Sequence, residues 1–152
     1  MSIAISLHLL ATIIWVGGMF FAYMALRPVA ATLLPPAQRM PLWVQTFARF
    51  FPWVWAAVII LPATGYWMLY ERFGGLTGAP LYAHLMQGIG IVMILIFLHV
   101  FFAPYARLRR TVAASDFADA GRHLAQIRRL IGLNLILGLV TAVVAGAGRY
   151  LG

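Results

Sequence analysis

The chain has 152 residues, of which 64% are hydrophobic and only 9% are charged, and its mean hydropathy is +0.94. This composition excludes an ordinary soluble domain and is typical of an integral membrane protein. The 11 basic residues are all arginine, and the net charge is +8. Arginines beside apolar runs report membrane orientation and contact with anionic headgroups, so no nucleic-acid partner is expected. The absence of cysteine excludes disulfides and thiolate metal sites.

Four apolar runs are long enough, or nearly so, to cross a bilayer, which takes about 20 residues each. They cover residues 3–26, 53–70, 81–102 and 130–147. The remaining segments are too short for a separate soluble domain. Residues 1–152 are therefore predicted to form a single transmembrane domain, an all-α integral membrane four-helix bundle that contacts the lipid bilayer. The sequence does not indicate an oligomeric state.

The arginines predict an orientation for these spans. Nine of them lie in the connections after the first and third runs, namely Arg27, Arg39, Arg49, Arg107, Arg109, Arg110, Arg122, Arg128 and Arg129. Only Arg72 and Arg149 lie elsewhere. The positive-inside rule places the two arginine-rich connections in the cytoplasm and both termini in the periplasm. We expect a multi-pass protein of the bacterial inner (cytoplasmic) membrane.

Both cytoplasmic connections contain amphipathic segments. The first connection has four prolines that are expected to break any helix after the first span, at Pro28, Pro35, Pro36 and Pro41. Residues 42–51 then read as an interfacial segment that leads into the second span. In the other connection, Ser115 is expected to cap a helix over residues 116–129 that continues into the fourth span.

Two histidines fall inside the apolar runs. His8 lies in the first run and His84 just inside the third, and both runs point inward from the periplasmic side. At 1.5 Å per residue, His8 lies roughly 8 to 9 Å below the start of its span, and His84 lies about 5 to 8 Å below the start of its own span. An ionisable side chain inside a membrane span is energetically costly and therefore suggests a functional site. Neutral imidazoles on two helices favour bis-histidine ligation of a b-type haem, which would serve electron transfer or an oxidoreductase. A quinone or another redox partner is then a candidate partner.

Residues near the two histidines fit such a cofactor, although helix packing explains several of them equally well. Gly88 lies one turn below His84 and leaves room for a porphyrin, while Thr12 and Trp15 share the helix stripe of His8. The polar candidates are Arg27 and Arg129, as ligands of haem propionates or of a phospholipid headgroup, and Asn134, which requires a partner inside the fourth span.

Copper is the alternative cofactor, because methionine and histidine suit copper(I). The additional ligand candidates are Met68, Met86 and His99. His99 lies about 22 Å beyond His84 along the helix, near the cytoplasmic face. In a third interpretation the histidines only hydrogen-bond between helices, and the protein is a non-catalytic structural or partner-binding subunit. No catalytic group is identified, so whether the protein is an enzyme stays open.

Several motifs together resemble a known family. They are His8-Leu-Leu-x3-Ile14-Trp15-Val16-Gly17-Gly18-x-Phe20-Phe21, Leu26-Arg27-Pro28, Tyr82-x-His84, His99, Pro104-Tyr105-x-Arg107-Leu-Arg-Arg110, and Ile127-Arg128-Arg129-Leu-x-Gly132-x-Asn134. This set resembles the CopD-like bacterial membrane proteins over nearly the whole chain. The resemblance implies four membrane helices and a role in moving or handling copper at the inner membrane.

The spacing from His8 to Trp15 and Gly18 is also similar to that in HemJ-type protoporphyrinogen oxidases. The resemblance implies His8 as a ligand of b-type haem. The second ligand of that family is the lysine of a His-x-Lys motif, where this chain has His84-Leu85-Met86 and no lysine. The lysine and the oxidase activity therefore do not carry over, and a second ligand would be His84 or Met86.

Overall fold

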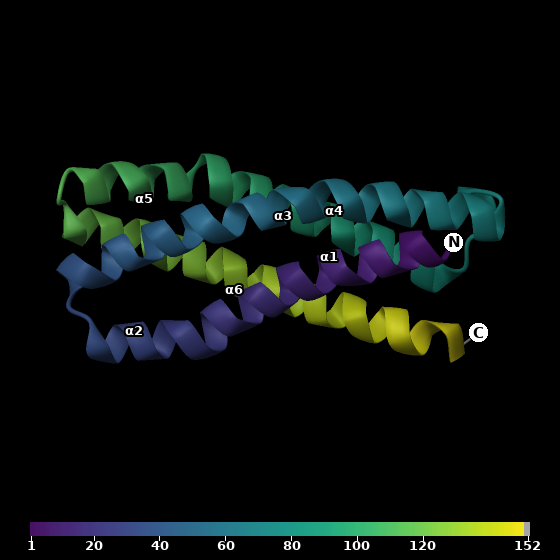
Figure 1. The fold of residues 1–152 in the computed structure, drawn as a ribbon, viewed down its shortest axis with the longest axis horizontal. Helices are drawn as coiled ribbons and strands as arrows, with labels where there is room; N and C mark the ends of the chain where they lie inside the picture. The colour runs from purple at the N-terminus through teal and green to yellow at the C-terminus, as the bar shows by residue number, and fades with distance from the viewer. Residues whose placement is uncertain (151–152) are drawn as a thin grey trace.

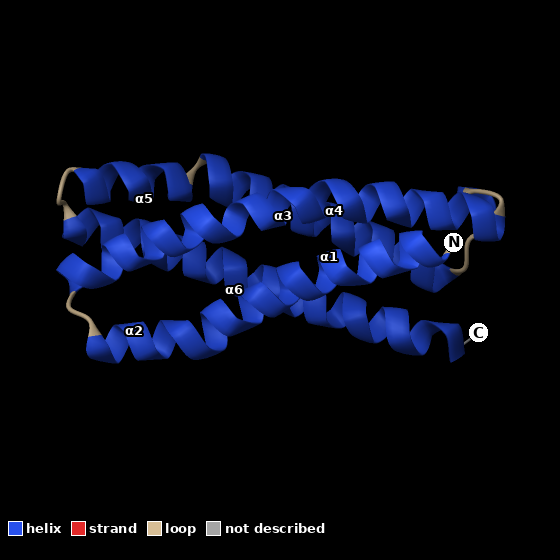
Figure 2. Cartoon of the chain, viewed as in Figure 1, coloured by secondary structure: helices blue, strands red, loops and turns tan. Residues whose placement is uncertain are grey.

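The computed structural model describes residues 1–150, and every regular element in that range is helical. In chain order the elements are α1 (Ser2–Phe20), η1 (Phe21–Leu26), α2 (Arg27–Leu33), α3 (Pro36–Phe73), η2 (Leu76–Gly78), α4 (Leu81–Phe102), α5 (Pro104–Ala113), α6 (Phe117–Ala147) and η3 (Gly148–Tyr150). Figure 2 shows helices joined by short loops over the described residues. The predicted all-α architecture is confirmed.

These elements form four long rods. Residues Ser2–Leu33, Pro36–Phe73, Leu81–Ala113 and Phe117–Ala147 are each long and apolar enough to cross a membrane. The N-terminus, the end of α6 and the connection between α3 and α4 lie at one end of the bundle (Figure 1). The other two connections lie at the opposite end, which we call the basic end because most of the arginines lie toward it. The chain is a multi-pass membrane protein whose rods alternate in direction.

Two glycines allow the sharp turn between α3 and α4. Gly74 and Gly75 have φ of 70° and 123°, in the region that favours glycine, and the Gly74 N–H donates to the Tyr70 carbonyl at 3.0 Å. Pro80 then precedes the first turn of α4. The turn brings α4 back beside the other rods.

The prolines after the first span interrupt the helix only at the Leu34–Pro35 junction, so the prediction that Pro28 and Pro41 break it is wrong. Pro41 lies within α3. Before Pro28, which lies in the first turn of α2, the chain widens into the π-helical turn η1, which ends with a bond from the Arg27 N–H to the Ala22 carbonyl. The next such bond would join residue 28 to the Tyr23 carbonyl, but proline has no N–H. The Arg27 side chain replaces it, because its Nε donates to that carbonyl at 3.2 Å.

The cap of α6 also differs from the prediction. Ser115 has a positive φ of 55° and precedes the cap, and the Asp116 side chain accepts the Asp119 N–H at 3.2 Å. Aspartate is as good an N-cap as serine, and its negative charge also suits the helix N-terminus. From this cap α6 runs without interruption from the amphipathic segment into the fourth apolar run.

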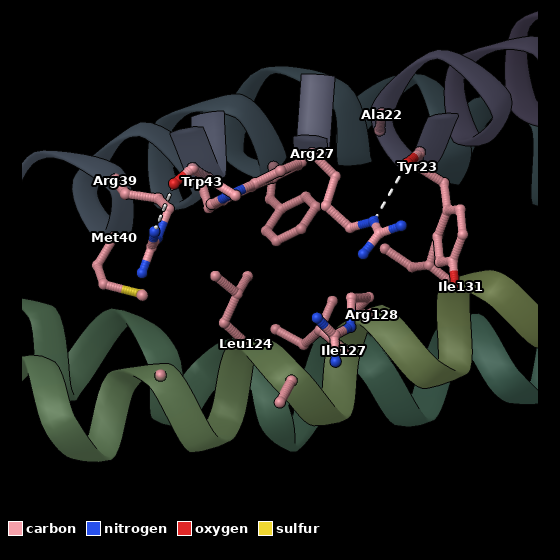
Figure 3. Close-up of a pocket in the computed structure, with 14 residues that line it drawn as sticks. Ala22, Tyr23, Arg27, Arg39, Met40, Trp43, Leu124, Ile127, Arg128 and Ile131 are labelled. Atoms are coloured by element: carbon pink, nitrogen blue, oxygen red, sulfur yellow. Dashed lines mark hydrogen bonds between the residues drawn. The ribbon is translucent and has the colours of Figure 1, made fainter. Parts of the chain in front are cut away.

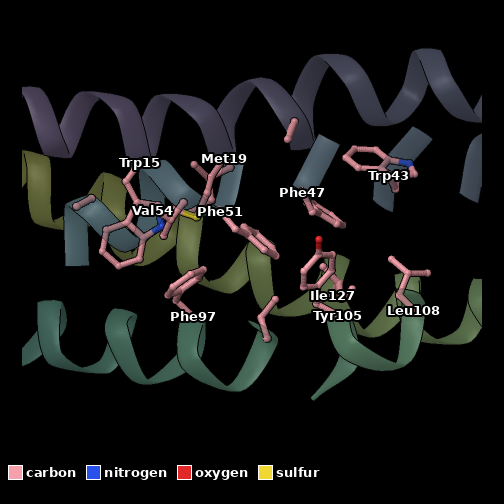
Figure 4. Packing of buried hydrophobic residues seen from close by; sticks show 14 of the residues in the cluster. Trp15, Met19, Trp43, Phe47, Phe51, Val54, Phe97, Tyr105, Leu108 and Ile127 are labelled. Atoms are coloured by element: carbon pink, nitrogen blue, oxygen red, sulfur yellow. The ribbon is translucent and has the colours of Figure 1, made fainter. Parts of the chain in front are cut away.

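The buried core lies toward the basic half of the bundle. Figure 4 shows Trp43, Phe47 and Phe51 of α3 close to Tyr105 and to side chains of α4 and α6. The Phe47 and Phe51 rings stack at 5.0 Å, and Phe51 meets Tyr105 edge-on at 4.8 Å. Such aromatic pairs contribute about 0.5–1.5 kcal/mol each beyond burial. Since lipid is as apolar as these side chains, close packing rather than escape from water holds the rods together.

The outer half is packed less closely. No residue within 81–92 of α4 or 139–147 of α6 is buried. A Cβ added at Gly88, Gly90 or Gly146 would meet no atom within 4 Å. The helices of this half, which carry His8 and His84, therefore leave side chains accessible from the bilayer or from a partner.

Candidate functional site

His8 is half-buried on α1 and turns toward α3, the rod against which α1 mainly packs. Its Nδ1 lies 2.8 Å from the Oγ1 of Thr64, a buried hydroxyl on α3. The ring also lies over Gly65, where an added Cβ would come within 3.4 Å of the His8 Cε1. One side of the imidazole is therefore fixed by contact with α3.

The hydrogen bonds of Thr64 indicate which imidazole nitrogen carries the proton. The Thr64 hydroxyl has one proton, and it donates that proton to the Ile60 carbonyl at 2.6 Å. In the contact with His8 the hydroxyl must then act as acceptor, so Nδ1 of the neutral imidazole is the donor. In this tautomer Nε2 keeps its lone pair, while the Leu61 backbone of α3 also lies within hydrogen-bonding reach of the ring. Metal-binding histidines are commonly oriented in this way, by a bond from the other ring nitrogen.

His84 lies on α4, on the outer side of His8. Gln87, one turn further along α4, donates from Nε2 to the Tyr66 hydroxyl of α3 at 2.6 Å. This contact fixes the height of α4 relative to α3, just as the His8 contact with Thr64 does for α1. With 1.5 Å per residue, His84 lies about 7 Å further toward the outer end than His8. Both histidines belong to the outer half of the bundle.

Met68 lies at a height between the two histidines. It follows Thr64 by one turn on the same face of α3, about 6 Å further outward, and it is half-buried. Met86 is half-buried on α4, whereas His84 is exposed. Two histidines and two thioethers are thus distributed over α1, α3 and α4 in the outer half.

The structure does not enclose these side chains in a cavity. Among residues 1–150, no three histidine or carboxylate side chains approach closely enough to hold a metal ion. Neither His8 nor His84 lines the cavity between the first rod, α3 and α6, or the small one beside Trp15 and Phe97. The candidate site is therefore an open cluster of single donors, and its most strongly oriented member is His8.

Other residues on the stripe of His8 serve the helices themselves. The Thr12 hydroxyl donates to the His8 carbonyl on its own helix at 2.8 Å. Trp15 is only 2% exposed and packs edge-on against Phe97 at 6.3 Å. Trp15 also lines a small cavity of about 20 Å³ together with Met19 and Phe97, which is too small for a porphyrin, so its environment suits the packing alternative.

Asn134 has the interhelical partner that its position in a span requires. It is buried on α6, and its Nδ2 donates to the Met93 carbonyl of α4 at 3.3 Å. Its Oδ1 is buried without a hydrogen-bond partner. Asn134 thus ties α6 to α4 in the middle of the bundle.

The remaining candidates lie toward the basic end. Arg27 is separated from His8 by an unbroken helical rod, at about 28 Å along its axis, so a group bound at His8 does not reach it. Arg129 is exposed on α6, and His99 is exposed in the last turn of α4. The structure therefore separates the arginines and His99 from the cluster around His8.

Thr64 was missed by the sequence reasoning. A threonine inside an apolar helix most often bonds a carbonyl of its own helix, and Thr64 does so as well. Its second contact joins residues 56 positions apart, and no local pattern indicates such a pair.

A comparison with protein families gives one match: the model described as "Copper resistance protein D" matches residues 44–147. This range runs from the first part of α3 to the end of α6 and includes Thr64, Met68 and His84, whereas His8 precedes it. No curated protein and no solved structure matches the chain.

Proposed function

The chain belongs to the copper resistance protein D family, and from this premise we propose that it is a membrane protein that binds copper(I) at His8 and transfers it within the bilayer. The observation that carries the proposal is the 2.8 Å contact between His8 Nδ1 and Thr64 Oγ1, from which we infer that Nε2 is the nitrogen with a lone pair for a metal ion. Neutral imidazole and thioether are ligands that suit copper(I). In this proposal copper is the transported substrate, so it binds transiently and is not a resident cofactor.

Met68 and His84 are the proposed further ligands. They lie on α3 and α4, both within roughly 8 Å of the height of His8 along the bundle axis. A series of single donors at successive heights suits the passage of an ion, because no position holds it too tightly to release. Met86 on α4 is a candidate later contact, whereas His99 lies in the last turn of α4, away from the proposed ligands.

The distribution of the arginines supports a direction of copper transfer. With the basic end in the cytoplasm, as the positive-inside rule implies, the cluster around His8 faces the periplasmic half of a bacterial inner membrane. Copper would then enter from the periplasmic side. An ion moved as cargo needs no quinone or other redox partner.

The bis-histidine b-type haem stays a prediction, and the open geometry favours copper over it. A flat macrocycle needs a slot between α1 and α4, but α1 packs mainly on α3 and α4 mainly on α6. His84 is exposed, and nothing lies within 4 Å of a Cβ at Gly88 to form the wall of such a slot. A metal ion requires only the donor atoms.

Copper binding can be tested by competition with a chromophoric copper(I) chelator under anaerobic conditions, using purified protein in detergent. We expect His8→Ala to weaken copper(I) binding more than tenfold, because it removes the oriented donor. His99→Ala is the matched control, since it deletes an exposed imidazole at the far end of α4, and it should bind as the unmodified protein does.

Two results would overturn the proposal. One is a colourless protein that binds no copper, which would support the structural interpretation. The other is a red protein whose Soret band shifts on reduction with dithionite and disappears in His8→Ala, which would establish haem instead.

A further inference from the structure

A cleft of about 280 Å³ opens at the basic end between the first rod, α3 and α6. Figure 3 shows Met40 and Trp43 of α3 on one side and Leu124 and Ile127 of α6 on another. It lies far from His8 and is distinct from the proposed copper site.

Three arginines from three different elements line this cleft. They are Arg27 of α2, Arg39 of α3 and Arg128 of α6. Arg27 donates from Nε to the Tyr23 carbonyl and lies over the Tyr23 ring at 4.6 Å, and Arg39 donates from Nη1 to the Ala31 carbonyl at 3.3 Å. Each of these two guanidiniums is thereby held in place while most of its five N–H donors stay free.

No carboxylate neutralises these arginines. The ion pairs among the described residues all involve Asp119, which pairs with Arg122 and His123. Neither Asp119 nor any other acid lines the cleft. Three positive charges at one cleft repel one another, and an anion with several acceptor oxygens would relieve that repulsion through charge-assisted hydrogen bonds.

The cleft crosses the boundary between the apolar spans and the basic segments. Ala22 and Tyr23 belong to the first apolar run and Ile131 to the fourth, whereas Arg39 and Arg128 lie outside these runs. A ligand that fits this lining has an anionic head and an apolar tail. We propose that the cleft binds an anionic phospholipid of the leaflet at the basic end. Its phosphate contacts the three arginines, and its acyl chains lie against the apolar wall.

The proposal can be tested by native mass spectrometry of the full chain in detergent, titrated with dioleoyl-phosphatidylglycerol. The variant Arg27→Gln/Arg39→Gln/Arg128→Gln should bind this lipid at least about tenfold more weakly, a loss of about 1.4 kcal/mol. The matched control, Arg107→Gln/Arg109→Gln/Arg110→Gln, removes three exposed arginines from the same end outside the cleft and should bind as the unmodified protein does. The Arg→Lys triple variant of the cleft keeps its charge and should retain most of the binding.

Two further probes distinguish the source of the phosphate. Dioleoyl-phosphatidylcholine, which has a phosphate but no net charge, should bind much more weakly than the anionic lipid. Inorganic phosphate at millimolar concentration should not displace the anionic lipid, because it has no acyl chain. Displacement by phosphate would mean that the cleft binds a free anion, and equal loss of lipid binding in both Gln variants would mean that no site exists. Either result would overturn the proposal.

Discussion

At the scale of single residues, the decisive contact is between His8 and Thr64. A threonine hydroxyl that donates its proton to the Ile60 carbonyl can only accept from the imidazole, and this favours the tautomer of His8 with its proton on Nδ1. In the proposed copper site, Thr64 would therefore be a positioning residue that acts through His8.

The role of Thr64 predicts a loss in the Thr64→Val variant. Valine keeps the shape of the side chain but cannot accept the Nδ1 proton, so copper(I) affinity should fall by about 10- to 100-fold, as for other partners that orient a ligand. Thr64→Ser should retain the affinity. Thr141→Val is the control, because Thr141 only bonds a carbonyl of its own helix. If Thr64→Val binds copper within twofold of the unmodified protein, in the same chelator competition, Thr64 does not position His8.

At the scale of the elements, glycines determine how closely α1 approaches its neighbours. A Cβ at Gly18 would overlap the Phe50 ring of α3, and one at Gly138 of α6 would lie 2.8 Å from the Val16 Cγ2. Gly17 has no atom within 4 Å of the corresponding position. One of the two adjacent glycines of α1 thus allows close packing, whereas the other faces open space.

Alanine substitutions at the adjacent residues Gly17 and Gly18 give a controlled test of how closely α1 packs on α3. Gly18→Ala should destabilise the protein by about 1–3 kcal/mol, because the Phe50 ring must move in a closely packed interface. Gly17→Ala adds the same methyl group to the same helix without a contact and should not destabilise. Thermal unfolding in detergent, followed by circular dichroism, measures both changes. Equal melting temperatures would show that α1 does not pack on α3 at Gly18.

At the scale of the whole molecule, the two halves of the bundle differ. Aromatic side chains fill the core toward the basic end, where Phe51 contacts Tyr105 at 4.8 Å, whereas 81–92 of α4 contains no buried residue. A closely packed half keeps the rods in register, and the looser half leaves His8 and His84 accessible. This division suits a protein that holds its helices at one end and exchanges an ion at the other.

The proposed orientation can be tested with single cysteines, because the natural chain contains none. Thr77 lies in the connection between α3 and α4 and Ala114 in the one between α5 and α6, and both residues are exposed. In intact bacterial spheroplasts, a membrane-impermeant maleimide should label Thr77→Cys at once and Ala114→Cys only after the membrane is opened. The reverse pattern would place the basic end outside and would change the proposed direction of copper entry.

The amino-acid sequence by itself determined the four membrane helices, their alternation and the choice of His8, because run length, charge and a polar residue in lipid are local properties. The continuation of the helix through Pro28 and the partnership of His8 with Thr64 were decided only by the tertiary structure. The helix continues through Pro28 because the Arg27 side chain bonds the Tyr23 carbonyl, which proline leaves without a backbone partner. The partnership of His8 with Thr64 depends on the contact between α1 and α3. Arg27, Arg39 and Arg128 likewise meet only because the rods place three distant segments around one cleft. The physical reason is common to all of these: a hydrogen bond or a shared cavity depends on positions in space, which distance along the chain does not encode.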